Sequence, residues 1–457
     1  MGRPRVPAFV TVLLAVTLVA CSSSGSKAPA TTAAPVTSAT TATTAAPLTA
    51  SFRGVTATTI KIGFAQIDFN CLKQFIDYNF GDQPAISQVF VDDINAHGGI
   101  LGRKLVAVYK KFCPIGNTQA LATCTALTED ESVFAVLGNL YDATGDAPLC
   151  LSRDHQTIYD GFDVQQSWID QSPPGLMVTI EFTAERRVSV LMSILKSQGT
   201  LTGKKVATFT DQNNASIVTK IVKPALDGMG VAQGSPGVVT IVGSDTSAAQ
   251  SQLDSYIEKW KGEGVTAVYL EGLSVASKQF VEKIKQQMPN VLLLTDGFDA
   301  AQLGGQDETA AGVKPNPYDG MITADGPSES QQWQLPSVQA CVKTYENATG
   351  QTVVGPDQLK PDANGVRVRV WAAVRDTCGQ LAFFKQVADK AGPNLTNDTW
   401  RQAVDSFGTV QLVDTPYASV HAGKYAANDA FGMVVFDSTY GPKGDFRHVG
   451  PIQDISS

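Results

Sequence analysis

Acidic side chains follow several stretches that have the composition of buried β-strands. In the second half of the chain, Asp211, Glu271 and Asp296 each stand at the end of an apolar run. In an open parallel sheet, the carboxyl ends of the strands border the crevice in which a ligand binds. The sequence therefore predicts that these three carboxylates face a ligand-binding cleft.

A second group of candidates lies in the turn 139–145, which follows a predicted strand in the first half of the chain. These residues are Tyr141, Asp142, Ala143 and Thr144. Backbone N–H groups at the start of a helix can bind an anion, and hydroxyl side chains can assist them. The Asp142 carboxylate can equally serve as the N-cap of that helix. Both interpretations of Asp142 stay open.

Two further segments at predicted strand ends complete the candidate set. The long connection 65–82 contains Asp68, Cys71 and several aromatic residues, and it either shapes the ligand site or only covers the end of the lobe. Phe162 follows a short predicted strand over 157–159. We include Asp68 and Phe162 among the predicted ligand-binding residues.

The sequence contains no recognisable catalytic or metal-binding pattern. The four histidines include no pair at metal-ligand spacing, and Cys-x-x-Cys is absent. There is no Gly-x-Ser-x-Gly elbow and no recognisable pair of nucleophile and base. We expect no metal, no cofactor and no enzymatic activity.

The elements that must position these residues are those of a parallel sheet. Apolar Val89 and Ile94 recur at helical spacing, and Gly98 and Gly99 end that helix. The β-branched run 104–109 follows as a strand, so helix, turn and strand form part of a βαβ crossover. The alternation continues over predicted strands 206–210, 238–242, 265–270 and 291–294, predicted helices 216–229, 248–261 and 275–287, and the long predicted helices 337–348 and 366–391.

The run from Asn95 to Lys104, Asn-Ala-His-Gly-Gly-Ile-Leu-Gly-Arg-Lys, resembles the signature of type I periplasmic solute-binding proteins of the branched-chain amino acid receptor family. The resemblance covers about residues 54–457. It implies an α/β fold with two doubly wound, Rossmann-like lobes joined by a three-stranded hinge. The expected lobes are 54–180 with 325–408, and 181–324 with 409–457.

The resemblance also assigns roles to some of the candidates. In this family, hydroxyl side chains and N–H groups at the turn after the third strand hold the carboxylate of an amino acid, and Thr144 can do so here. Tyr141 and Asp142 replace the usual serines, and an acid is unfavourable where a carboxylate docks. Glu185 matches an acid that can meet the ligand's amino group, although acids are common in the first turn of any helix.

The N-terminus has the pattern of a bacterial lipoprotein. Two arginines precede an apolar run over 7–20 that is too short to span a bilayer comfortably. The tetrapeptide Leu-Val-Ala-Cys ending at Cys21 resembles the lipobox, in which the cysteine thiol takes a diacylglycerol. Residues 1–21 are the predicted signal peptide, and the polar, small-residue segment 22–53 is a predicted disordered tether. We expect a lipid-anchored protein at the outer face of the cell membrane.

Charge and cysteine content restrict the partners and the compartment. The net charge is −8, and it becomes −10 without the two arginines of the signal peptide, which argues against nucleic acid as a partner. Six cysteines besides Cys21 predict three disulfides in an exported protein. Cys341 and Cys378 lie on two predicted helices that can pack side by side. The pairing of the other four stays open: Cys71, Cys113, Cys124 and Cys150.

We therefore expect a solute-binding lipoprotein of an ABC importer. Its two lobes would close on an amino acid, an amide, a small aromatic compound or a similar polar solute. The resemblance implies permease subunits as partners, with ATP hydrolysis on other chains. The alternative is a surface sensor or interaction lipoprotein of the same fold without a transporter. The sequence does not identify the solute.

Overall fold

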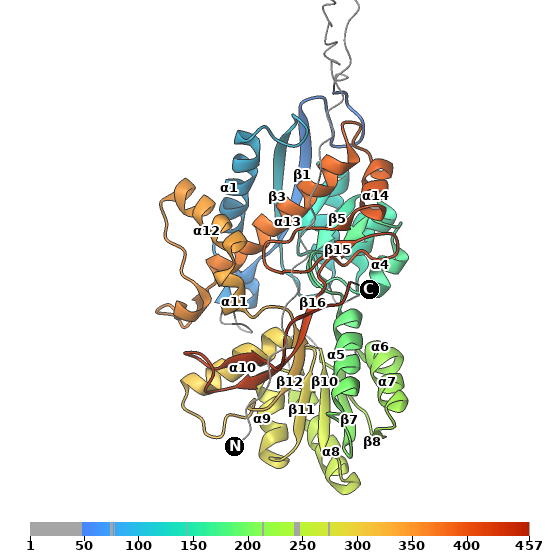
Figure 1. Ribbon diagram of the computed structural model, residues 1–457, viewed down its shortest axis with the longest axis vertical. Helices are drawn as coiled ribbons and strands as arrows, with labels where there is room; N and C mark the ends of the chain where they lie inside the picture. Colours follow the sequence, from blue (N-terminus) through green and yellow to red (C-terminus); the bar gives the residue numbers. More distant parts are fainter. Residues whose placement is uncertain are drawn as a thin grey trace, which may run out of the picture. The chain divides into compact units, whose positions relative to one another are not determined.

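The computed structural model describes residues 48–456, except 74, 75, 77, 143, 213, 242–246, 273 and 274 (Figure 1). The predicted signal peptide, Cys21, most of the predicted tether and Ala143 lie outside the described residues. The described chain forms two mainly parallel sheets covered by helices, as predicted. None of its described helices is long and apolar enough to cross a membrane.

The first sheet has five parallel strands in the order β3-β1-β4-β5-β6. They are β1 (Thr59–Ile67), β3 (Lys104–Phe112), β4 (Ala135–Gly138), β5 (Ile158–Gly161) and β6 (Met177–Val178). Ile62, Phe64 and Ala65 of β1 are almost fully buried, because helices cover both faces of a parallel sheet. We refer to this sheet and its helices as the first lobe.

The helices of the first lobe come from both ends of the described chain. They are α1 (Gln83–Ala96), α2 (Thr118–Thr125), α3 (Asp146–Leu149), α4 (Gln166–Gln171), α12 (Pro336–Thr349), α13 (Val370–Ala391) and α14 (Asn397–Asp405). The orange α13 packs beside the blue α1 in Figure 1. The predicted helix 366–391 begins only at Val370, because β13 (Arg367–Val368) pairs with β2 (Tyr78–Asn79).

The run 95–104, which resembles the family signature, makes structural contacts at both of its ends. Asn95, in the last turn of α1, donates to the Leu105 carbonyl at 2.9 Å and accepts from the Leu105 N–H at 2.7 Å. A Cβ atom at Gly99 would lie 2.0 Å from the Arg103 carbonyl oxygen, so the turn requires glycine. The buried Arg103 guanidinium donates to the carbonyls of Thr56 and Pro393. The run thus connects α1 to β3 and to the distant segment that contains Pro393.

The second sheet mixes parallel and antiparallel strands in the order β17-β16-β12-β11-β10-β7-β8, with β9 also beside β7 and β18 beside β16. The parallel strands are β7 (Lys205–Asp211), β8 (Ala232–Gln233), β9 (Gly237–Val239), β10 (Ala267–Glu271), β11 (Leu292–Thr295) and β12 (Ile322–Asp325). The antiparallel strands are β16 (Ala430–Asp437), β17 (Asp445–His448) and β18 (Gln453–Asp454). This sheet and its helices form the second lobe.

Helices cover both faces of the second sheet. They are α5 (Ala184–Gln198), α6 (Ala215–Ile217), α7 (Lys223–Gly228), α8 (Ser247–Glu263), α9 (Lys278–Gln287) and α10 (Phe298–Ala310). Phe209, Trp260 and Phe280 belong to the apolar core on one face. Leu191 and Tyr269 belong to the core on the other. The helix α10, with two glycines in its middle, was not predicted from the sequence.

The chain passes between the two sheets three times: after β6, after β12 and before β16. After β12 it forms α11 (Glu329–Gln334) and returns to the first lobe through α12 and α13. The short pair β14 (Gly408–Thr409) and β15 (Ser419–Val420) precedes the last passage. Val410 and Leu412 pack in the core of the first lobe, although we expected the second lobe to resume at 409. The packing therefore extends the first lobe beyond the expected boundary.

The six described cysteines form three disulfides, as predicted. Cys341–Cys378 joins α12 to α13. The pairing that the sequence left open is Cys71–Cys113, which links the turn after β1 to the end of β3, and Cys124–Cys150, which links α2 to the π-helical turn after α3.

Candidate functional site

The three acids predicted at strand ends of the second lobe lie at the carboxyl ends of neighbouring strands. Asp211 ends β7, Glu271 ends β10 and Asp296 follows β11 directly. The central strand β10 pairs in parallel with both of its neighbours. The fold therefore brings the three carboxylates to one edge of the sheet, as expected for strand ends in a parallel sheet.

Glu271 is fully buried, and neither of its carboxylate oxygens has a hydrogen-bond partner among the described residues. The Tyr269 hydroxyl, two residues earlier on the same strand, lies close enough to lower the pKa of the Glu271 carboxyl, although the two groups do not reach the geometry of a hydrogen bond. Burial, followed by the neighbouring Asp296 carboxylate, raises the pKa of the Glu271 carboxyl well above its ordinary value. A buried acid without a partner is costly, so its retention needs a reason.

Asp211 and Asp296 have partners within the second lobe. The Asp296 carboxylate accepts from the Gly272 N–H at 2.7 Å, and burial raises the pKa of Asp296 although the Arg187 charge opposes the shift. The Asp211 carboxylate accepts from the backbone and side-chain amides of Asn214 at 3.2 and 3.2 Å. Arg187, on α5, donates to the Asp296 carbonyl at 3.3 Å and supplies positive charge at this edge.

The turn after β4 in the first lobe is organised around Asp142, which has no exposed surface. One carboxylate oxygen accepts from the Thr144 N–H at 2.8 Å, the Thr144 hydroxyl at 2.6 Å, and the N–H groups of Gly145 and Asp146 at 2.7 and 3.2 Å. The other accepts from the Ala147 N–H at 2.7 Å. The N-cap position of α3 is Gly145 and not Asp142, but the Asp142 carboxylate accepts from the N–H groups of the first two residues of that helix. These contacts favour the structural interpretation of Asp142.

Tyr141 and Phe162 lie at the same edge of the first lobe, and both side chains are half-buried. The Tyr141 ring lies 6.1 Å from that of Trp168, centroid to centroid. Burial, and then the charges of Asp163 and Asp211, raise the pKa of the Tyr141 hydroxyl above its ordinary value. Because Asp211 belongs to the second lobe, the strand ends of both lobes lie within electrostatic range of one hydroxyl.

Asp68 caps the short 3₁₀ turn Phe69–Leu72, where its carboxylate accepts from the Asn70 N–H at 3.0 Å. The nearby aromatic residues pack on one another: the ring of Phe80 lies 5.1 Å from Phe69 and 5.9 Å from Tyr78. The Arg369 guanidinium lies over the Tyr78 ring. These contacts favour the interpretation of this connection as a cover for the first lobe.

Glu185 stands in the first turn of α5, where its carboxylate accepts from the N–H groups of Gln166 at 2.7 Å and Ser167 at 3.3 Å. Those N–H groups begin α4 of the first lobe. Both oxygens of Glu185 thus have partners in the other lobe, so the residue joins the lobes near a crossing segment. The expected contact of Glu185 with a ligand amino group stays a prediction.

Two buried groups at the carboxyl ends of the strands were not predicted from the sequence. Tyr269 precedes Glu271 by two residues, and the period of a β-strand places both side chains on the same face, so the pattern could have revealed it. Asp160, in β5, is fully buried with no hydrogen-bond partner for its carboxylate among the described residues, and burial raises its pKa well above the ordinary value. An acid in a short apolar strand was the available signal.

Two cavities lie away from the strand ends that carry the candidate residues. One of about 310 Å³ borders Glu185, Arg186 and Lys424 beside the crossing segments. Burial lowers the pKa of Lys424 to about 8, although its ammonium pairs with buried Asp429. A larger one of about 490 Å³ lies at the amino ends of β7 and β10, opposite the edge that carries the acids.

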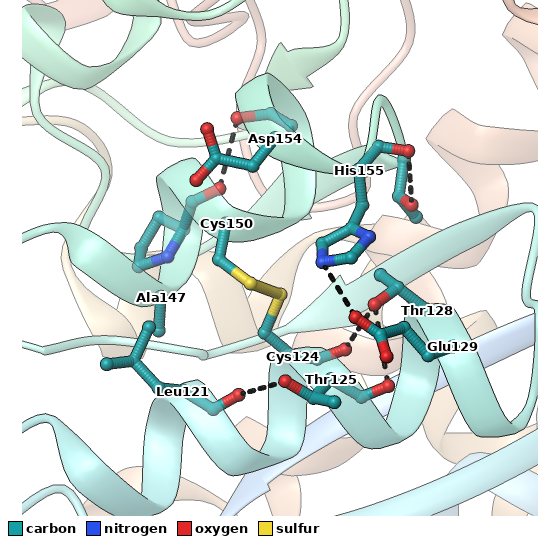
Figure 2. The surroundings of a disulfide bond; sticks show 12 residues. Leu121, Cys124, Thr125, Thr128, Glu129, Ala147, Cys150, Asp154 and His155 are labelled. Carbon is teal, nitrogen blue, oxygen red and sulfur yellow. Dashed lines mark hydrogen bonds and ion pairs between the residues drawn. A yellow bond between two sulfur atoms is a disulfide. The ribbon is translucent and has the colours of Figure 1, made fainter.

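One group of potential metal ligands among the described residues consists of Cys124, Cys150 and His155. Figure 2 shows that the two cysteines are joined as a disulfide, with His155 turned toward Glu129. The His155 Nε2 atom lies 3.5 Å from a Glu129 carboxylate oxygen. Disulfide sulfurs are not the thiolates that bind zinc, so the group is a structural one in this oxidised form.

Comparisons with known proteins agree with this architecture. The model of a family described as periplasmic binding protein matches residues 85–438. A fatty acid ABC transporter substrate-binding protein from Thermomonospora curvata is similar in fold, with 15% identity and a TM-score of 0.61 over 88% of this chain and 94% of that chain. A leucine binding protein from Thermotoga maritima is similar with 12% identity and a TM-score of 0.59 over 85% of this chain and 98% of that chain.

A third similar structure is a Rhodopseudomonas palustris ABC transporter solute binding protein in complex with 4-hydroxybenzoate. It has 13% identity and a TM-score of 0.61, over 87% of this chain and 98% of that chain. The search of curated protein sequences gave no match.

Proposed function

The chain belongs to the periplasmic binding protein family, whose members act outside the cytoplasm. From this premise we propose that it is the solute-binding component of an ABC importer. The predicted fold, two α/β lobes of the type I periplasmic binding proteins, is confirmed. The observation that carries the proposal is the set of polar groups at the carboxyl ends of both sheets, where open α/β sheets bind ligands.

The proposed binding mode is closure of the two lobes on the solute. Groups from both lobes, Tyr141 and Phe162 on one side and Asp211, Glu271 and Asp296 on the other, would contact it together. A solute that touches both lobes favours the closed arrangement by the difference in its affinity for the two states. The three crossing segments would then act as the hinge. We expect no chemical change of the solute.

We further propose that a lipid on Cys21 anchors the protein to the outer face of the cell membrane. The support is the lipobox-like tetrapeptide and the long polar segment that separates Cys21 from β1. Labelling growing cells with an alkyne fatty acid should mark the wild-type protein. A Cys21→Ser variant should remain unlabelled, and an equal label on that variant would contradict the anchor.

The solute-binding proposal is tested by a thermal-shift screen of residues 47–457, which form one compact unit. Amino acids, amides, amines and small aromatic compounds form the library. A solute at a hundred times its dissociation constant adds about 2.7 kcal/mol to the free energy of unfolding, which is easily visible as a higher melting temperature. A folded protein that responds to no compound would contradict the proposal.

The importer itself is tested in the native cell. Deletion of the protein should abolish accumulation of the solute that the screen identifies, and the wild-type gene should restore it. Unchanged accumulation, with binding intact, would favour the alternative of a surface sensor or interaction protein.

A further inference from the structure

The N–H groups of residues 144–147, after β4, are already engaged by the protein itself. Those of Thr144, Gly145 and Ala147 donate to the Asp142 carboxylate. Each N–H group offers one hydrogen, so a solute carboxylate would have to displace these bonds. It would also meet the negative charge of Asp142, which lies inside the turn. A solute carboxylate is therefore excluded from the N–H groups of residues 144–147.

In the second lobe, by contrast, a buried acid has no partner within the described part of the chain. The Glu271 carboxylate is fully buried at the end of β10, and its oxygens have no hydrogen-bond partner among the described residues. Asp211 and Asp296 flank it on the neighbouring strands. Burial of a carboxylate is costly unless a cation or several hydrogen-bond donors meet it. An ammonium group supplies both at once.

An organic cation fits this edge better than a metal ion. Among the described residues, the one group of potential metal ligands found close together is that of Cys124, Cys150 and His155. Asp211, Glu271 and Asp296 do not form such a group. The half-buried rings of Tyr141 and Phe162 supply apolar surface at the facing edge, which suits the carbon skeleton of an amine.

We propose that the solute is an organic ammonium cation without a carboxylate, with its ammonium bound by Glu271 beside Asp211 and Asp296, and its carbon skeleton against Tyr141 and Phe162. This inference rests on the proposed function, because it names the class of solute that the same site binds. It excludes ordinary amino acids, whose carboxylate would have no donor at the turn that Asp142 occupies.

Matched compounds test the inference by calorimetric titration of residues 47–457. Each set shares one skeleton and differs in its charged groups: 3-methylbutylamine, leucine and 4-methylpentanoate; 2-phenylethylamine, phenylalanine and 3-phenylpropanoate; 1,4-diaminobutane, ornithine and 5-aminopentanoate. At least one amine should bind about tenfold or more tightly than the amino acid and the acid of its set.

Glu271→Gln should weaken the binding of that amine about 30-fold or more, because the ammonium loses a buried charged partner. The matched control is Glu258→Gln, the same change at an exposed pair with Lys261 on α8, which should leave the affinity unchanged. Asp142→Ser should release the N–H groups and allow the acids to bind. If Asp142→Ser is folded and binds none of the acids, the argument from the occupied turn is wrong.

The outcomes separate this inference from the function on which it rests. An amino acid or acid that binds as tightly as its amine overturns the inference and leaves the proposed function standing. Binding of Ca²⁺ or Mg²⁺ in competition with the amine overturns it in favour of a metal site. If none of the compounds binds the folded wild-type protein while the thermal-shift screen finds a solute of another class, the inference fails and the proposed function stands. If neither experiment finds a ligand, both fail. The titrations of the wild-type protein test the inference by themselves, even if a variant does not fold.

Discussion

The turn after β4 and the end of β10 occupy corresponding places in the two lobes, since each strand lies between two parallel neighbours in its sheet. Both places contain a fully buried acid, but the acids differ in their partners. Asp142 accepts hydrogen bonds from four backbone N–H groups and one hydroxyl, whereas Glu271 accepts none among the described residues. The first acid stabilises the fold, and the second has the properties of a ligand contact.

The difference shows why an acid at a strand end does not identify a binding site by its presence alone. A buried carboxylate that has several N–H partners is stabilised in its charged form. A buried carboxylate without partners destabilises the unliganded protein and gains its partners when a ligand binds. Strain of this kind is usually retained where function needs it. The predictions below test this contrast, from the largest expected effect to the smallest.

Asp142→Ala should reduce the free energy of unfolding by about 3–4 kcal/mol, because the N–H groups of the turn lose a charged acceptor. Urea unfolding followed by circular dichroism measures the change. Asp146→Ala is the control, since that acid is exposed at the start of α3, and it should cost less than about 1 kcal/mol. Equal losses in both variants would contradict the structural role of Asp142.

The disulfide Cys124–Cys150 (Figure 2) holds the π-helical turn that continues α3. The helix α3 begins directly after the turn that contains Asp142. Replacing both cysteines by alanine should lower the free energy of unfolding by about 3 kcal/mol, through the entropy of the unfolded chain. Binding of the solute by the folded variant should change little, because the disulfide supports the first lobe only. A loss of affinity larger than the loss of stability would place the disulfide at the site.

An isosteric pair of variants compares the two acids directly. Asp142→Asn should cost about 2 kcal/mol, because the neutral amide oxygen is a weaker acceptor and the NH₂ group faces N–H donors. Glu271→Gln should not destabilise the unliganded protein, because the neutral amide avoids the cost of burying a charge. Parallel urea titrations without solute measure both. A larger loss for Glu271→Gln would mean that Glu271 has structural partners.

The stability of the unliganded protein should also depend on pH through Glu271. The pKa of this carboxyl is raised in the folded state, so the folded protein holds its proton at pH values where the unfolded chain has lost it. The contribution to stability is therefore present below the unfolded pKa of 4.5 and is lost as pH rises through the folded pKa. Glu271→Gln should remove this part of the slope in urea titrations across pH 4–8.

Asp160→Asn provides an independent check of this pH dependence. Asp160 of the first lobe is buried, and burial raises its pKa as it raises that of Glu271. The variant should remove its own part of the slope in the same urea titrations. A slope that is identical in the wild type and in both variants would contradict the assignment of these two acids.

Local pattern was sufficient to predict most of the elements. The helix that ends at Gly98, the strand 104–109 and the alternation in the second lobe follow from spacing and glycine, which act between neighbours in the chain. The start of α13 was misplaced because Arg367 and Val368 pair with Tyr78 and Asn79, nearly three hundred residues away. Pairing over such a distance leaves no periodic trace in the sequence.

The sequence by itself determined the parallel α/β class, the number of disulfides and the placement of acids at strand ends, because residue type and short-range spacing set all three. Tertiary structure alone decided which cysteines meet, which lobe Val410 joins, and which acids find partners. A hydrogen bond depends on atoms about 3 Å apart, and such distances arise only when segments far apart in the chain pack together. That is why Asp142 and Glu271, alike in sequence context, differ in what they do.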